Sequence, residues 1–333
     1  MPLDTVSSII VRGALQDVSI AYRNGDYVSD MVFPIIDGLS RKTKVAKYAK
    51  GQWFRDLAEV RAPGTAARVA DMKVSSVNLD PIQYATATQV TDEELEESKK
   101  TGNIPIQPEI DAQEFMADIL DLSREARTAA VVHAASWSGE AAGGVDAEGG
   151  WGHATAASDT FLADIKTATD TIKANTGKLP NTLLLSYPAW SALKIAPALL
   201  ALMYPTSLAA GSLVQVSSLE ALIGMKVIVG GAITNSLGEN AADDAFAPVY
   251  TWGTSGSDRK GIGFVYYRPE RPGLKVVSAG YQYRVKQAGG SGRLLTSWRD
   301  DARHATMYDA IEEVDIAAVC LDAGFLFKDT ATT

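Results

Sequence analysis

The sequence predicts an α+β fold with an N-terminal arm, a projecting β-hairpin, one unusually long helix and a later α/β-layered region. Three observations support this prediction. Residues 41–73 carry a net charge of +6 and are followed by residues 92–125 with a net charge of −8. An apolar stripe at three- and four-residue steps extends from Phe115 to His133 within a helix predicted over 108–136. After residue 158, helical and strand patterns alternate, as in a layered α/β unit.

Residues 1–40 are predicted to form an extended arm with apolar anchors. Tyr22, Phe33 and other apolar residues are scattered among turn signals, and Pro34 prevents the preceding residues from continuing as a helix.

Residues 41–88 are predicted to form an extended hairpin. Apolar and polar residues alternate over 54–62 and again over 70–75, which predicts two strands, and Pro63-Gly64 between them is typical of a turn. The apolar residues in these runs are mostly small, and a lone two-stranded ribbon is marginally stable in water. We therefore expect the hairpin to pack on another surface.

The charge pattern suggests that this surface belongs to another copy of the chain. Residues 41–73 contain nine basic and only three acidic residues, whereas residues 92–125 contain eleven acidic and three basic residues. Complementary charge of this kind supplies register and steering between partners. The residues predicted to form the subunit interface are Lys42, Lys44, Lys47, Lys50, Arg55, Arg61, Glu93, Glu94, Glu97, Glu114 and Asp118.

The long helix is predicted to begin at Pro108, because the first helical position needs no N–H donor. Glu109 and Asp111 fall in its first turn, where the helix dipole favours negative charge. Continued to about residue 135, it would span roughly 40 Å at 1.5 Å per residue. Its predicted apolar stripe consists of Phe115, Ile119, Leu122, Ala126, Ala129 and His133, with Glu114, Asp118, Asp121 and Glu125 elsewhere on its surface.

The glycine-rich segment 138–157 is predicted to be a loop or boundary. A second amphipathic helix follows, with Ser158 as candidate N-cap and Gly177 as its end. Another helix is predicted from Pro188. Strands are predicted at Thr182–Ser186, Met225–Val229, Pro248–Trp252, Gly263–Arg268, Leu274–Val285 and Met307–Val319, the last two long enough to lie beside the long helix.

The composition excludes several classes of function. The net charge of −9 argues against tight binding to a phosphate backbone, which needs many basic residues on one surface. A single cysteine, Cys320, excludes an intrachain disulfide and fits a reducing compartment. The start of the sequence lacks the features of a secretory signal, and the most apolar run, residues 195–204, is too short to span a bilayer. These features predict a soluble protein assembled in the cytoplasm.

A search for catalytic, cofactor and metal motifs gives one coincidence. Ser191-Ala192-Leu193-Lys194, Ser76-Val77-Asn78 and Lys100-Thr101-Gly102 match the elements of penicillin-binding serine enzymes, but in scrambled order. The acidic cluster at 92–97 lacks the spaced ligands and the glycine of an EF-hand, so it is interpreted as a solvated or partner-facing turn. We expect no catalysis, cofactor or bound metal, with a cytosolic serine hydrolase as the alternative from another class.

Several separated stretches together resemble the major capsid (coat) proteins of tailed bacteriophages. They are DVSIAYRNGDYVSDMVFP (17–34), KYAKGQWFRDLAEVRAPGTAA (47–67), KLPNTLLLSYPAWSALK (178–194), KVIVGGAITN (226–235) and PVYTWG (248–253). Their combined order carries the resemblance, which covers most of the chain.

The resemblance implies the Hong Kong 97-like, or Johnson, capsid fold. Carried over, the domains are an N-terminal arm at 1–40, an extended loop at 41–88, and a peripheral domain at 89–157 with its spine helix at 108–136. An axial domain at 158–255 follows, and strands at 256–333 return to the peripheral domain.

The function implied is that of a major capsid protein that self-assembles, through hexamers and pentamers, into an icosahedral head shell enclosing phage double-stranded DNA. It implies location in the virion head after assembly in the bacterial host cytoplasm, little specific DNA binding and no membrane partner. It leaves room for scaffolding, portal and decoration proteins as further partners. An encapsulin-like compartment for protein cargo is the alternative within the same fold.

Overall fold

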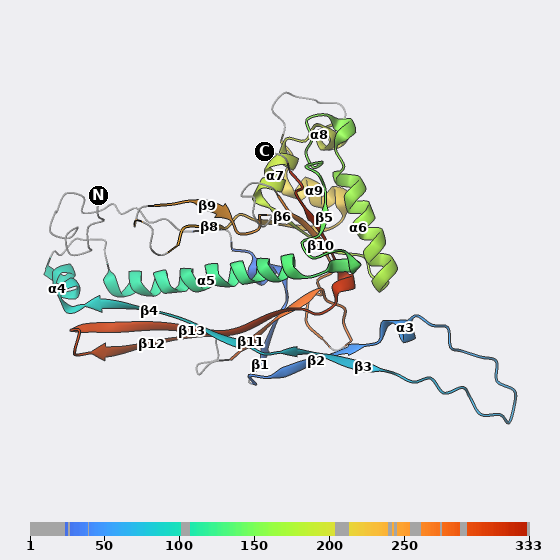
Figure 1. Ribbon diagram of the computed structural model, residues 1–333, viewed down its shortest axis with the longest axis horizontal. Coiled ribbons are helices and arrows are strands. Elements are labelled where there is room, and N and C mark those ends of the chain that lie inside the picture. The colour runs from blue at the N-terminus through green and yellow to red at the C-terminus, as the bar shows by residue number, and fades with distance from the viewer. Residues whose placement is uncertain are drawn as a thin grey trace.

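The computed structural model describes residues 24–25, 27–38, 40–100, 107–203, 213–238, 242, 245–253, 261–273, 275–286 and 292–331. Most of the predicted arm, residues 1–23, lies outside the described residues. Figure 1 shows an elongated molecule with three parts: a long helix lying along a sheet, a compact layered domain above one end of them, and a loop projecting beyond that end.

The first sheet is built around one long strand. Strand β13 (Ala305–Ala318) pairs antiparallel with β4 (Ile82–Thr91) on one side and with β12 (Arg293–Asp300) on the other. Its last residues pair with β11 (Gly280–Val285), which in turn pairs in parallel with β1 (Ile35–Gly38). The ladder with β4 begins at residue 82, so residues 82–88, predicted as part of the extended loop, belong to this sheet.

The long helix α5 (Pro108–Ala134) covers this sheet and confirms the helix predicted over 108–136. Met116 and Leu120 on the helix pack against Val90 of β4 and Tyr308 of β13. The predicted apolar stripe is wrong in its register, because Phe115 is 61% exposed and most of the stripe is only partly buried. The buried residues of the helix are Met116, Leu120, Arg124, Glu125, Thr128, Ala129 and Val132.

The compact domain contains a second sheet in the order β5-β14-β10-β6-β7. These strands are β5 (Val145–Asp146), β6 (Thr182–Ser186), β7 (Lys226–Gly230), β10 (Gly263–Tyr266) and β14 (Gly324–Lys328). Its helices are α6 (Phe161–Thr176), α7 (Tyr187–Lys194), α8 (Pro197–Met203) and α9 (Val216–Ile223). The alternation α6, β6, α7, with β6 and β7 parallel, confirms the predicted α/β unit.

Alternate residues along the strands of this second sheet face two different hydrophobic cores. Leu183 and Val265 face the helices, in a core that includes Phe161 and Ile165 of α6. Leu184 and Phe264 face the other way, toward Val132 of α5 and the arm residues Val32 and Phe33. The second core therefore joins the arm, the long helix and the compact domain.

Helix α6 ends as predicted and begins differently. Gly177 has a φ of +72°, the left-handed geometry that favours glycine after a helix. The predicted N-cap Ser158 is wrong, because it closes the short 3₁₀ helix η2 (Ala156–Ser158). Instead, the Asp159 carboxylate accepts a hydrogen bond from the Phe161 N–H at 3.0 Å.

Several short elements complete the described fold. They are α2 (Ser29–Val32), β2 (Thr43–Tyr48), α3 (Lys50–Trp53), β3 (Val74–Leu79), α4 (Asp92–Lys100), η1 (Trp137–Gly139), β8 (Ile233–Asn235), β9 (Pro248–Tyr250) and η3 (Leu321–Ala323). Strands β9, β10 and β11 confirm three of the predicted strands with shorter bounds, and β13 confirms a fourth that begins two residues earlier than predicted. Leu274 lies outside the described residues. Strand β12 was not predicted.

Gly263 provides a test of packing between the second sheet and the segment before α6. A Cβ on Gly263 would lie 2.1 Å from Cη2 of Trp151, whose side chain is buried. Gly263→Ala is therefore expected to lower the free energy of unfolding by about 1–3 kcal/mol through overpacking. Gly238→Ala is the matched control, because a Cβ there meets nothing within 4 Å. Equal thermal unfolding of the two variants would contradict this packing.

Candidate subunit interface

The extended loop is a ribbon that is paired only at its root. Strands β2 and β3 form a six-pair ladder from Thr43↔Leu79 to Tyr48↔Val74. The strands predicted over 54–62 and 70–75 are wrong for most of their length, since residues 54–73 form no ladder. The predicted turn at Pro63-Gly64 is confirmed, with a φ of +85° at Gly64 and a hydrogen bond from the Thr65 N–H to the Ala62 carbonyl.

Beyond the β2–β3 ladder, the loop exposes apolar side chains as well as its backbone. The large apolar residues Trp53, Phe54, Val60, Val69 and Met72 are all exposed, Val60 completely. Figure 1 shows this segment extending away from the rest of the molecule. Backbone groups and apolar side chains presented together are typical of a surface that pairs with another chain.

The predicted basic residues lie along the loop, and two bases at its root contact acids of the same chain. Arg41 forms an ion pair with Glu313 of β13 at 2.7 Å, and Lys50 forms one with Asp322 of η3 at 2.9 Å. Lys42, Lys44, Lys47, Arg55 and Arg61 are exposed, and their side chains form no ion pair within the described part of the chain. The basic charge of the loop is therefore only partly balanced within one subunit.

The predicted acidic turn at 92–97 is wrong: these residues form the helix α4. Glu94 and Thr91 make a capping box, in which the Thr91 N–H donates to Glu94 at 3.1 Å and the Glu94 N–H donates to the Thr91 hydroxyl at 3.4 Å. Hydrogen bonds from Arg299 hold the pKa of the Asp92 carboxyl below its usual value. Glu93 is exposed on the same helix, and Glu97 is half-buried.

The two acids predicted on the long helix differ in their surroundings. Glu114 is exposed. Asp118 is half-buried, and its carboxylate accepts a hydrogen bond from the Tyr27 hydroxyl at 3.1 Å. Part of its hydrogen-bonding capacity is therefore used inside the subunit. Burial raises the pKa of Tyr27 to about 12.

The acidic helix and the projecting loop lie at opposite ends of the elongated molecule (Figure 1). The positive and negative segments noted in the sequence therefore do not meet within one subunit. A contact between them would need a second copy of the chain.

Sequence reasoning missed a buried junction that ties the arm to the long helix. Glu125, predicted at the helix surface, is fully buried. Its carboxylate accepts hydrogen bonds from the N–H groups of Val28 and Ser29, at 3.0 and 2.7 Å, and from the indole N–H of Trp252. Burial raises the pKa of Glu125, although these donors act in the opposite direction.

The neighbouring residue Arg124 anchors a second buried contact. Its guanidinium bonds Glu312 of β13 at 2.9 Å and Asp121 at 2.8 Å, and lies 3.5 Å from Asp30 of α2. Arg293 of β12 also contacts Asp121, at 2.6 Å. These charges fix the helix on the sheet. Nothing in the local sequence signals their burial, because their partners are distant in the chain.

Among the described residues, the three motif elements that match penicillin-binding serine enzymes do not come together. Ser191 lies on α7, Ser76 on β3 and Lys100 at the end of α4, three separate parts of the molecule in Figure 1. Thr101 and Gly102 lie outside the described residues. Within the described ranges, no group of three or more His, Cys, Asp or Glu residues could hold a metal ion.

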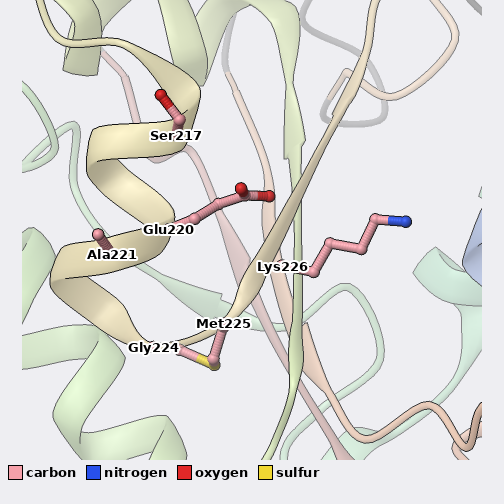
Figure 2. A pocket seen from close by; sticks show the side chains of 6 residues that line it. All are labelled: Ser217, Glu220, Ala221, Gly224, Met225 and Lys226. Carbon is pink, nitrogen blue, oxygen red and sulfur yellow. The ribbon is translucent and has the colours of Figure 1, made fainter.

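A shallow groove lies where α9 meets β7 (Figure 2). It is lined by Ser217, Glu220, Ala221, Gly224, Met225 and Lys226. Glu220 already accepts a hydrogen bond from the Val227 N–H at 2.9 Å, so its carboxylate serves the local fold. The groove offers no converging set of catalytic side chains.

Comparison with known proteins rests on structure, since no family model and no curated protein matches the sequence. A phage-related protein from Bordetella bronchiseptica is similar with a TM-score of 0.63 and 20% identity, over 100% of this chain and 98% of that one. The capsid structure of cyanophage P-SCSP1u has a TM-score of 0.59 and 14% identity, over 93% of this chain and 90% of that one. A virus-like particle from Pyrococcus furiosus has a TM-score of 0.50 and 10% identity, over 97% of both chains.

These matches extend over nearly the whole chain. At this level of identity they establish the fold. The chain has the fold of the phage capsid structures, the Hong Kong 97-like fold that the sequence resemblance implies.

Proposed function

We propose that this chain is a major capsid protein, which self-assembles through hexamers and pentamers into an icosahedral head shell enclosing phage double-stranded DNA. The observation that carries the proposal is the extended loop, which exposes its backbone and its apolar side chains far from the rest of the subunit. Such a loop gains stability only when another copy covers it. The fold, shared with phage capsid structures, supports the same function.

The arrangement of charge suggests how copies meet. The basic loop lies at one end of the subunit and the acidic helix α4 at the other, so an end-to-end contact places opposite charges together. Head-to-tail contacts of this kind close into rings when the rotation between copies permits. Many weak contacts engaged at once then give a stable shell.

The direct test is electron microscopy and size-exclusion chromatography of the expressed protein. Shells, or rings that convert to shells, are expected. A small oligomer at every concentration and ionic strength would contradict the proposal and would favour the third candidate, a cytosolic enzyme.

The loop charges provide a sharper prediction. Reversal of Lys44, Lys47 and Lys50 to Glu places like charge against α4 of the neighbour and is expected to block assembly, or to make it dependent on added salt. We expect the protein concentration needed for assembly at low salt to rise about tenfold or more. Light scattering against protein and salt concentration measures this threshold.

The matched control reverses the exposed Lys166, Lys173 and Lys178, which changes the net charge equally but lies on and just after α6. Lys50→Glu alone separates the loss of the intrasubunit pair with Asp322 from the effect on the neighbour. Shells of unchanged yield and stability across ionic strength would refute the electrostatic contact.

An encapsulin-like compartment with protein cargo is the alternative on the same fold. The content of purified particles separates the two functions: double-stranded DNA supports the phage head, whereas a defined cargo protein supports the compartment. The net charge of −9 fits an inner wall with little specific affinity for DNA.

We infer location in the virion head after assembly in the cytoplasm of a bacterial host, with scaffolding, portal and decoration proteins as candidate partners. No described helix has the length and apolar character needed to cross a membrane.

A further inference from the structure

The root of the extended loop contacts the body of the same subunit through side chains. Just after β2, the one-turn helix α3 places Trp53 edge-on against Tyr48, with ring centroids 6.0 Å apart. Lys275, from the connection between β10 and β11, lies over both rings, with its Nζ 5.7 Å from the Tyr48 centroid and 6.0 Å from that of Trp53. A cation close to two aromatic rings favours one position of the loop root.

Two further contacts hold the same short segment. Lys50 bonds Asp322 of η3 at 2.9 Å. The Phe54 ring lies against Gly177, where an added Cβ would be 3.3 Å from a ring carbon. The root is therefore held at three separate points of the body: the end of α6, the β10–β11 connection and η3.

Farther out, the loop is also bonded to itself. Past Phe54, an ion pair between Arg68 and Glu59 joins its two arms. Because the root contacts are exposed, each is weak by itself in water. Together they orient the loop without holding it permanently.

We propose that Tyr48, Lys50, Trp53 and Phe54, with Lys275, Asp322 and Gly177 on the body, form a latch that fixes the direction of the loop in the free subunit. The latch presents the loop to a neighbour already oriented, so less conformational freedom is lost on association. Its weak contacts also allow the loop to change direction where a shell requires a different angle. The role in assembly rests on the proposed function, whereas the orientation of the loop does not.

The test removes only the body side of the latch. The variant Lys275→Ala/Asp322→Ala leaves every loop residue unchanged. The matched control is Lys166→Ala/Asp170→Ala, which also removes one lysine and one aspartate, here from an exposed ion pair on α6. Spin labels on Val60→Cys in the loop and Ala174→Cys on α6, with Cys320→Ser, report the distance between loop and body. Unassembled subunits are used for this measurement.

The latch variant is expected to give a distance distribution about twofold broader than the control, and an initial assembly rate at least about fivefold lower. Equal distributions would overturn the latch. A broader distribution with an unchanged assembly rate would overturn its role in assembly. If no variant and no wild-type protein forms shells, the proposed function fails, while the distances in the free subunit still decide whether the latch exists.

Discussion

Deletion of residues 57–70, with Asp56 joined to Asp71 through two glycines, is expected to leave a folded subunit that forms no shells. Leu57 is half-buried, and the other deleted residues are exposed. None belongs to a core cluster among the described residues. The root ladder of β2 and β3 remains intact, so the thermal midpoint is expected to change by no more than about 3 °C, as for surface changes generally.

The assembly defect should be complete, because the deletion removes both the apolar surface and the unpaired backbone that a neighbour would cover. Sedimentation and electron microscopy measure shells, and circular dichroism measures the fold. Shells of normal size and yield from the deleted protein would show that the loop is dispensable and would remove the main support for the proposed interface.

A milder variant separates apolar contacts from loop length. Val60→Ser/Val69→Ser/Met72→Ser keeps every charge and every backbone group of the loop. If apolar burial drives docking, at about 25 cal/mol per Å² of buried apolar surface, this variant should assemble only at higher protein concentration. Assembly equal to wild type would instead assign the contact to charge and backbone pairing.

The parts of the fold that follow from local chemistry could be predicted from the sequence. Pro108 begins the long helix, Gly177 ends α6 in the left-handed conformation, and the apolar run at Thr182–Ser186 is the central strand β6. Each of these features is determined by residues within a few positions of itself. The order of elements follows from them.

The sequence-based predictions fail where contacts with residues distant in the chain determine burial or strand pairing. Arg124 and Glu125 are buried because Glu312, Val28 and Trp252 contact them. Their charge predicts a solvent-exposed position, and the predicted register of the buried stripe is therefore wrong. The loop strands were misplaced for the opposite reason. Their alternation of apolar and polar residues is real, but no partner strand within the described chain completes the ladder beyond Tyr48.

The predicted interface was only partly accessible to sequence reasoning. Charge asymmetry identified the loop and the acidic segment, and the structure adds that they lie at opposite ends of the subunit. The capping box of Thr91 and Glu94 is a local sequence signal for the start of α4, although the acidic run around it is also typical of a solvated turn. The ion pairs of Arg41 and Lys50 depend on the fold, because Glu313 and Asp322 lie more than 250 residues further along the chain.

Replacement of Glu125 is expected to destabilise the subunit and to release the arm. In Glu125→Ala, the buried N–H groups of Val28, Ser29 and the Trp252 indole lose their acceptor. An unsatisfied buried donor costs about 1–3 kcal/mol, so a loss of about 3 kcal/mol or more in the free energy of unfolding is expected. Hydrogen exchange of the peptide covering residues 27–33 should increase more than that of α6.

The dependence of stability on pH provides a second measure of the same junction. Burial raises the pKa of Glu125 in the folded subunit above its unfolded value. The folded state therefore binds the proton more tightly, and this contribution to stability is fully present below the unfolded pKa, about 4.3 for glutamate. It is lost as the pH rises through the folded pKa.

Glu125→Gln cannot titrate, so the free energy of unfolding of the wild type minus that of this variant should fall as the pH rises through that window. Chemical denaturation of unassembled subunits from pH 4 upward measures the difference, and Glu114→Gln on the exposed side of the same helix is the matched control. A slope of the same size for Glu114→Gln would assign the effect to loss of a carboxylate from the helix and not to the buried junction. A pH-independent difference for Glu125→Gln would mean that its hydrogen-bond donors fully compensate for burial, and the junction would then be purely structural.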